Sequence, residues 1–263
     1  MEYICGLGVI AGFMTLLWII SVFIKDASIV DPFWGFSFVL INVYYLFAFG
    51  INGMEQLVLL AMVTLWGLRL SIYLWIRNKG KGEDFRYQQF RKDYGENRYW
   101  WVSFFQVFLL QATLAWLISA PLYAINKNTG DNHIGALELT GIIIWLIGFS
   151  FETIGDYQLT RFKSDPSNKG KLLTTGLWKY TRHPNYFGDA AAWWGFGIFG
   201  LAAGGYVNFL GSVLMTILLI RVSGVMLLEK SLVNSKPGYA EYIERTSAFI
   251  PWFPSGKKKS QKI

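Results

Sequence analysis

Residues 4–24 read ICGLGVIAGFMTLLWIISVFI, without a charged side chain. A helix of about 20 apolar residues crosses the roughly 30 Å of hydrocarbon in a bilayer. The segment follows Met1-Glu-Tyr3 and has neither the basic leader nor the small-residue cleavage site of a secretory signal. We therefore predict that it is a retained membrane-spanning helix.

Six further segments have the same apolar character. The chain of 263 residues is 53% hydrophobic and 16% charged, whereas soluble domains have about 45–50% apolar and about 25% charged residues. This composition excludes an ordinary soluble domain, a disordered chain and a disulfide scaffold. We predict an all-α, multi-pass integral membrane protein with about seven transmembrane helices in one domain over 1–254, and a basic cytoplasmic tail over 255–263. The six further spans are expected at about 35–52, 57–76, 102–125, 134–151, 186–206 and 209–228.

The basic residues are distributed unevenly between the two sides of the predicted membrane. Four connections on one side hold 21 of the 24 lysines and arginines, whereas the other side has only Lys127. Because cytoplasmic loops are enriched in these residues, we expect the C-terminus inside and the N-terminus outside. The same sorting accounts for the net charge of +7 without a nucleic-acid partner. The four connections are 25–34, 77–101, 152–185 and the chain after 228.

Ionisable groups recur within the predicted spans and at their ends. At membrane depth each is costly unless it is paired or hydrated. Residues four apart share a face of a helix, and several spans repeat polar residues at this spacing. A structural ion pair would explain any single charge, whereas their convergence predicts a hydrated cavity open to the cytoplasm. The groups are Arg69, Tyr73 and Arg77; Glu152 and Asp156, followed by Lys163; Asn185, Asp189 and Trp193; and Arg221 with Glu229.

Two cytoplasmic connections carry residue types that bind phosphate. Residues 77–87 read RNKGKGEDFRY; glycines let a backbone approach a phosphate, which cations neutralise. The spacing is not that of a Walker or Rossmann motif, and a solvated loop is the alternative. Together with residues 77–87, a second basic cluster could bind an anionic nucleotide. This cluster consists of Lys163, Lys169, Lys171, Lys179 and Arg182.

A resemblance to a known family is carried mainly by residues 150–254. Residues 175–189 read TGLWKYTRHPNYFGD, residues 151–159 read FETIGDYQL, and residues 239–253 read YAEYIERTSAFIPWF. These segments resemble the steroid 5-alpha reductases, in the prokaryotic-type branch called DUF1295. Residues 30–35 (VDPFWG) and 82–87 (GEDFRY) are also similar to that branch.

The resemblance implies a membrane oxidoreductase that binds NADPH at its cytoplasmic mouth, with 150–254 as the cofactor-binding region. Its substrate would be a hydrophobic, steroid-like or other lipid enone whose carbon-carbon double bond is reduced. The host membrane would be the bacterial inner membrane or the endoplasmic reticulum. Membrane lipids are the other expected partner, no metal is expected, and two histidines do not suffice for a three-histidine zinc site.

The resemblance also implies a set of cofactor-binding residues. Lys163 and Lys171 stand where the steroid enzymes have arginines, which keeps the charge but loses bidentate geometry. Arg182 and His183 match a version of the motif found in membrane methyltransferases. The full expected set is Tyr73, Arg77, Arg86, Asp156, Lys163, Lys171, Tyr180, Arg182, His183, Asn185, Asp189, Trp193 and Glu229.

The catalytic residues implied by the resemblance are Asp31 and a tyrosine. Asp31 is the counterpart of a glutamate that polarises the substrate carbonyl in the steroid enzymes, although capping of a helix would also explain it. The family's tyrosine position carries Trp66, so Tyr44 or Tyr45 is expected to supply the hydroxyl. Anchoring at the membrane interface is the alternative for these two tyrosines.

Two other functions remain open on the sequence alone. A membrane methyltransferase of the isoprenylcysteine or phospholipid type, using S-adenosylmethionine, would share the Arg182-His-Pro184 element and a late glutamate. Such enzymes have paired glutamates there, whereas this chain has Glu229-Lys230, and adenosylmethionine has no phosphate for the many cations. A noncatalytic lipid-binding protein is the third possibility.

Overall fold

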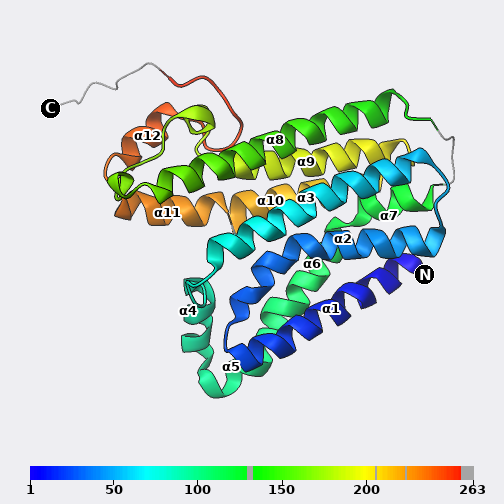
Figure 1. The fold of residues 1–263 in the computed structure, drawn as a ribbon, viewed down its shortest axis with the longest axis horizontal. Coiled ribbons are helices and arrows are strands. Elements are labelled where there is room, and N and C mark those ends of the chain that lie inside the picture. The colour runs from blue at the N-terminus through cyan, green and yellow to red at the C-terminus, as the bar shows by residue number, and fades with distance from the viewer. Residues whose placement is uncertain (129–132, 205, 223, 256–263) are drawn as a thin grey trace. The chain divides into compact units, whose positions relative to one another are not determined.

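The computed structural model describes residues 1–128, 133–204, 206–222 and 224–255. Their regular structure is helical, and no strand occurs among them beyond one isolated bridge between Thr181 and Ser247. The chain divides into two compact units (Figure 1). The first unit comprises Met1–Glu138 and Phe199–Gly211, and the second comprises Leu139–Ile198 and Ser212–Ile263.

The first unit is built from helices in the N-terminal half of the chain. Two of its long helices end at a residue with positive φ, Lys25 at 55° and Gly50 at 76°. A left-handed conformation of this kind stops a helix because the next amide can no longer reach back along it. The helices are α1 (Glu2–Ile24), α2 (Val30–Phe49), α3 (Met54–Asn78), α4 (Phe85–Tyr94), α5 (Glu96–Ser103), a π-helical stretch (Phe104–Leu109), α6 (Leu110–Ile118) and α7 (Ala120–Lys127).

The second unit combines one long helix with shorter ones. The long helix, α8, has 29 residues, which is enough to extend beyond the hydrocarbon core of a membrane. A π-helical stretch at Leu218–Val222 follows α10. The helices are α8 (Ala136–Ser164), α9 (Pro184–Leu201), α10 (Phe209–Ile217), α11 (Val225–Ser235) and α12 (Tyr239–Arg245), and α8, α9 and α10 have their first or last residues in the first unit.

Five helical stretches of the described chain are long and apolar enough to cross a membrane. The predicted all-helical class is therefore confirmed, and these five helices are compatible with a multi-pass membrane protein, while the count of seven and the orientation stay predictions. The predicted span 209–228 is represented by a shorter apolar helix, Phe209–Val222. The five stretches are Glu2–Ile24, Ala27–Phe49, Met54–Asn78, Glu96–Ile118 and Ala136–Ser164.

The helices differ from their predicted bounds by a few residues, and two of them differ most. The span expected at 102–125 begins earlier and stops at Ile118, and a separate helix starts at Ala120 with a proline in its first turn. The span expected at 134–151 continues to Ser164. Hydropathy marks only the apolar part of a helix, so the polar last turns of α8 were assigned to a connection.

Glycines let α8 and α9 pack against each other at backbone contact distance. Gly141, Gly148 and Gly155 are spaced by seven residues on α8, as are Gly188 and Gly195 on α9. A Cβ atom on Gly148 would overlap the backbone of α9 at Ala192, and one on Gly195 would lie 2.7 Å from the carbonyl oxygen of Gly141. Small residues at such intervals are typical of close helix pairs in membranes. The pair lies side by side in Figure 1, and its register sets which polar residues meet.

Candidate functional site

The start of α9 brings an amide onto an acid of α8. Asn185 Nδ2 donates a hydrogen bond to Asp156 Oδ1 at 3.1 Å. The close approach at Gly155, where a Cβ would lie 3.1 Å from the Asn185 amide nitrogen, holds the two helices at this distance. Asp156 is only 4% exposed, and one turn away on each helix Glu152 and Asp189 are also buried. The second unit therefore buries three carboxyl groups near one amide.

Arg182, His183 and Glu229 form a second polar cluster. Nε and Nη2 of Arg182 both lie 2.7 Å from Glu229 Oε1, and His183 Nε2 lies 3.3 Å from the same oxygen. Arg182 Nη1 donates to the carbonyl oxygen of Ile243 at 3.2 Å and to that of Thr246. These two carbonyls belong to the end of α12, where backbone acceptors lack partners within the helix. The guanidinium thus ties the segment before α9 to α11 and α12.

The electrostatics of this cluster favour the ionised glutamate. Burial alone would raise the pKa of Glu229, but the hydrogen bond from His183 and the hydrogen bond and charge of Arg182 lower it to about 2. The Arg182 guanidinium, which is expected to contact the cofactor, donates hydrogen bonds to Glu229 and to two backbone carbonyls in this structure. A cofactor contact by Arg182, His183 or Glu229 stays a prediction.

Segment 247–255 lies along the motif that precedes α9. The amide of Arg182 donates to the carbonyl of Ser247 at 2.9 Å, and the amide of Trp252 donates to that of Tyr180 at 2.9 Å. The rings of Tyr180 and Phe253 meet edge to face at 6.0 Å. Of the predicted tail, only Ser255 lies within the described residues, and it donates its amide to Arg245 at 2.9 Å. The C-terminal segment therefore fixes the backbone around Tyr180.

The remaining expected residues of the second unit fall into two environments. Trp193 is fully buried, and its carbonyl accepts a hydrogen bond from Ser212 Oγ at 2.7 Å. Lys163 and Lys171 are exposed, one at the end of α8 and one in the connection after it. Residues 157–180 contain five lysines and arginines against one carboxylate. This surface suits an anionic ligand.

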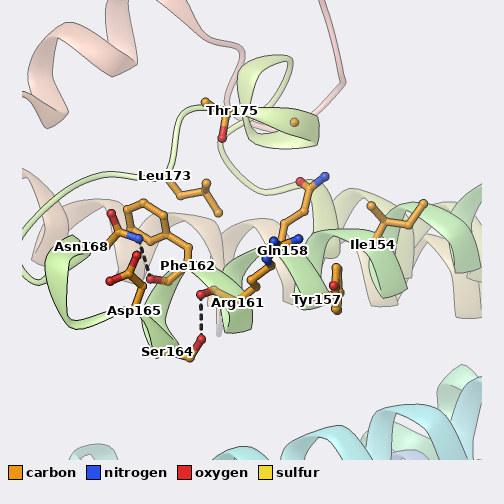
Figure 2. A pocket seen from close by; sticks show the side chains of 11 residues that line it. Ile154, Tyr157, Gln158, Arg161, Phe162, Ser164, Asp165, Asn168, Leu173 and Thr175 are labelled. Atoms are coloured by element: carbon orange, nitrogen blue, oxygen red, sulfur yellow. Dashed lines mark hydrogen bonds between the residues drawn. The ribbon is translucent and has the colours of Figure 1, made fainter.

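An open groove of about 760 Å³ lies beside the last turns of α8 (Figure 2). Figure 2 shows its lining side chains on α8 and on the connection that follows it. No residue of the expected cofactor set lines this groove. The sequence signal for this groove is the helical spacing of Ile154, Tyr157, Gln158 and Arg161, which the sequence reasoning did not single out. The lining residues are Ile154, Tyr157, Gln158, Arg161, Phe162, Ser164, Asp165, Asn168, Leu173, Thr175 and Gly176.

In the first unit, Asp31 receives two strong hydrogen bonds from α4. Arg86 Nη2 donates to Asp31 Oδ2 at 2.8 Å, and the Tyr87 hydroxyl donates to Asp31 Oδ1 at 2.6 Å. Asp84 caps the start of α4 and accepts from Arg86 Nε at 2.9 Å. Gln111 Nε2 donates to the Tyr87 oxygen at 3.4 Å. Asp31 is therefore the centre of a connected polar network.

The pKa values in this network keep the donors protonated. Burial would lower the pKa of Arg86, but the charge of Asp31 and the hydrogen bond and charge of Asp84 raise it. Burial and the charge of Asp31 raise the pKa of the Tyr87 phenol well above its ordinary value. The structure shows Arg86 between two carboxylates of its own unit, and its expected contact with the cofactor stays a prediction.

Tyr44 is not brought to Asp31. Both lie on α2, 13 residues apart, which corresponds to about 20 Å along a helix. The Tyr44 hydroxyl donates to Glu2 at 2.8 Å, and Tyr45 lies 3.4 Å from the Ser119 hydroxyl. The tyrosine that contacts Asp31 is Tyr87, which stood in the quoted motif at 82–87 but was not chosen. The structure does not bring Asp31 and Tyr44 together, and the catalytic role expected of each stays a prediction.

Residues expected on α3 lie on one face of that helix. The guanidinium carbons of Arg69 and Arg77 lie 5.9 Å and 5.7 Å from the centre of the Tyr73 ring. This agrees with their spacing of four residues. Trp66 is fully buried and packs edge to face on Phe38 at 5.6 Å.

Removing the Tyr87 hydroxyl tests whether the hydrogen bond to Asp31 stabilises the protein. Tyr87→Phe leaves Asp31 with one donor fewer, and we expect a loss of about 1.5–3 kcal/mol of stability, the usual range for a hydrogen bond to a charged group. The melting temperature of the purified protein in detergent measures this loss. Tyr94→Phe is the control, because Tyr94 is exposed at the end of the same helix. Equal melting temperatures for the two variants would contradict the network.

The fold is that of a helical protein with several helices able to cross a membrane. The family model described as "Protein of unknown function (DUF1295)" matches residues 17–246, and the chain belongs to this family. An uncharacterized protein of Schizosaccharomyces pombe is similar to it, with 24% identity over 261 residues, or 90% of this chain and 76% of that protein.

A more local similarity concerns a protein named as a probable O-methyltransferase, from Ustilaginoidea virens. It is 36% identical over 94 residues, which are 36% of this chain and 32% of that protein. The aligned part is thus about a third of each chain. No solved structure matches the chain.

Proposed function

We propose that this protein is a membrane-embedded, NADPH-dependent reductase of a lipid-like enone. The observation that carries the proposal is the donor set of the second unit. It combines the hydrogen-bonded pair of Asn185 and Asp156 with the cation-rich segment 157–180. The resemblance of residues 150–254 to the steroid 5-alpha reductases supports the same assignment.

Each part of this donor set suits a different part of NADPH. The Asn185 amide can both donate and accept, so it matches a carboxamide such as that of nicotinamide. Buried carboxylates such as Asp156 and Asp189 accept hydrogen bonds from ribose hydroxyls. Lys163 and Lys171 are exposed ammonium groups that would neutralise phosphates. The residues therefore fit a phosphorylated dinucleotide.

NADPH, when bound, supplies a hydride to the β-carbon of the enone, and a proton from water completes the reduction at the α-carbon. In the first unit, the Tyr87 phenol stays protonated and donates its one proton to Asp31, so it would donate to a carbonyl oxygen by exchanging that partner for the substrate. We assign to the Tyr87 hydroxyl the stabilisation of the negative charge that develops on that oxygen, and to Asp31 the positioning of this hydroxyl.

A titration of the purified protein with NADPH, followed by tryptophan fluorescence, tests the proposal. We expect saturable binding, and Lys171→Gln should weaken it by about tenfold, as for the loss of one charged hydrogen bond. Lys92→Gln is the matched control, because Lys92 is an exposed cation on α4. No saturation with NADPH, or equal affinity of both variants and the parent, would argue against the reductase.

A methyltransferase is the second candidate, and the similarity to the probable O-methyltransferase favours it. The buried carboxyl groups of Glu152, Asp156 and Asp189 would suit the cationic sulfonium of S-adenosylmethionine. The cations of segment 157–180 would then have no phosphate to bind. Saturable binding of S-adenosylmethionine, with no response to NADPH, would select this alternative.

A further inference from the structure

The groove at the end of α8 lies on the opposite face of that helix from the proposed cofactor residues. Ile154, Tyr157, Gln158 and Arg161 follow the spacing of one helical face. Glu152, Asp156 and Lys163 are rotated by about half a turn from them, at 100° per residue. A ligand of this groove is therefore distinct from the cofactor proposed above, and the inference does not depend on that proposal.

The position of the groove along α8 points to the edge of a membrane. A helix of 29 residues is about 43 Å long, whereas the hydrocarbon core is about 30 Å thick. The first 20 or so residues from Ala136 cross this core, so the turns after about residue 155 reach the head groups. Ile154 lies at this boundary, and Tyr157, which is 62% exposed, lies one turn further. Tyrosines are enriched at this depth because the ring is apolar and the hydroxyl is polar.

The chemistry of the groove changes along the helix in the same direction. Ile154 and Tyr157 line its membrane end, and Arg161, Asp165 and Asn168 line the remainder together with the apolar Phe162 and Leu173 (Figure 2). The Arg161 guanidinium is exposed and has no hydrogen-bond or ion-pair partner within the part of the chain that the structure describes. Such a cation within a groove is available to a phosphate from outside.

The groove keeps its shape through contacts of its own walls. Gln158 Oε1 accepts a hydrogen bond from the amide of Leu177 at 3.0 Å, which joins α8 to the connection at 173–176. Asn168 Nδ2 donates to the carbonyl of Phe162 at 3.1 Å (Figure 2). The other charged lining residue is Asp165, whose carboxylate caps the turn at Pro166–Asn168 through the amide of Ser167 at 2.8 Å. The negative charge of Asp165 repels an anion. Removing this charge should therefore strengthen anion binding, whereas removing the charge of Arg161 should weaken it.

We propose that this groove binds the head group of an anionic phospholipid, with the phosphate on Arg161 and an acyl chain alongside Ile154 and Tyr157. Phospholipid is the occupant that matches an apolar end at the hydrocarbon boundary and a cationic end among the head groups. Lys169, which is exposed in the connection after α8, adds attraction to an anionic surface.

Native mass spectrometry of the full-length protein in detergent, titrated with phosphatidylglycerol or phosphatidylcholine, tests the proposal. We expect tighter retention of phosphatidylglycerol and a loss of about fivefold in Arg161→Gln, the effect of one basic residue at an anionic surface. Asp165→Asn should strengthen retention, and Arg161→Lys should keep most of it. Arg98→Gln, which removes an exposed cation on α5, is the matched control and should bind like the parent.

Three outcomes would overturn the proposal. Arg161→Gln could retain phosphatidylglycerol as the parent does, or the parent could retain both lipids equally. Inorganic phosphate in excess could displace the lipid completely, which would identify a site for free phosphate. Because Arg161 is exposed, we expect its variants to fold, and Asp165→Asn provides an independent test if one of them does not.

Discussion

Gly148→Ala and Gly188→Ala are expected to prevent the second unit from folding. A Cβ on Gly148 would overlap the backbone nitrogen of Ala192, and one on Gly188 would overlap that of Glu152. A side chain could rotate away from such a contact, but a helix backbone cannot, so α8 and α9 would have to separate. Overpacking a core costs about 1–3 kcal/mol when side chains can adjust, and here the obstacle is rigid. We expect aggregated protein, measured as loss of the monodisperse peak in size-exclusion chromatography.

Glycines on α1 provide the matched control for this prediction. A Cβ on Gly8 or Gly12 meets nothing within 4 Å, and both lie within a regular helix. Alanine is about 0.5–1 kcal/mol more favourable than glycine in a helix, so Gly12→Ala should leave the melting temperature equal or slightly higher. A Gly148→Ala protein that purifies and melts like the Gly12→Ala protein would contradict the close packing of α8 and α9.

Arg182→Met is expected to cause the second largest loss of stability. The change removes the partner of Glu229 and leaves the carbonyls of Ile243 and Thr246 without a donor. Removing one partner of a buried ion pair costs about 3–5 kcal/mol, because the other charge stays buried. The Arg182 side chain is 6% exposed and that of Glu229 is 22% exposed, so we expect about 3 kcal/mol. The melting temperature in detergent measures it.

The same ion pair predicts a dependence of stability on pH. The pKa of Glu229 is lowered to about 2 in the folded protein, so its contribution is complete above the ordinary glutamate pKa of about 4.3. It is lost as the pH falls from there towards 2. We expect the melting temperature of the parent to fall over this range, and that of Glu229→Gln to fall less. An identical acid dependence in both proteins would show that the carboxylate is not stabilised by Arg182 and His183.

The sequence predicted what depends on local pattern. Apolar runs located the long helices, and a spacing of four residues placed Arg69, Tyr73 and Arg77 on one face of α3. It also placed Asn185 and Asp156 near each other, through a motif shared with a known family. The helices and the shared face of α3 follow from helix geometry, which is the same in every protein, whereas the pairing of Asn185 with Asp156 rests on the resemblance of their segments to a known family.

Contacts between distant segments could not be predicted in this way. Tyr87 reaches Asp31 because α4 turns back on the start of α2, and no spacing within either segment reveals this. The sequence instead offers Tyr44 or Tyr45, because these tyrosines lie on the span that neighbours the one with Trp66. The glycines spaced by seven on α8 and α9 were present in the sequence, but their pairing depends on the antiparallel register of the two helices.

The central claim, reduction of an enone with NADPH, is tested most directly by following the transferred hydrogen. The purified protein in lipid nanodiscs is supplied with NADPH deuterated at the transferable position and with a 3-oxo-4-ene steroid or another lipid enone. The account predicts a saturated product that carries one deuterium at the β-carbon, with loss of the signal in Asp31→Asn. Transfer of a labelled methyl group from S-adenosylmethionine to lipid, with no deuterium in any product, would contradict it.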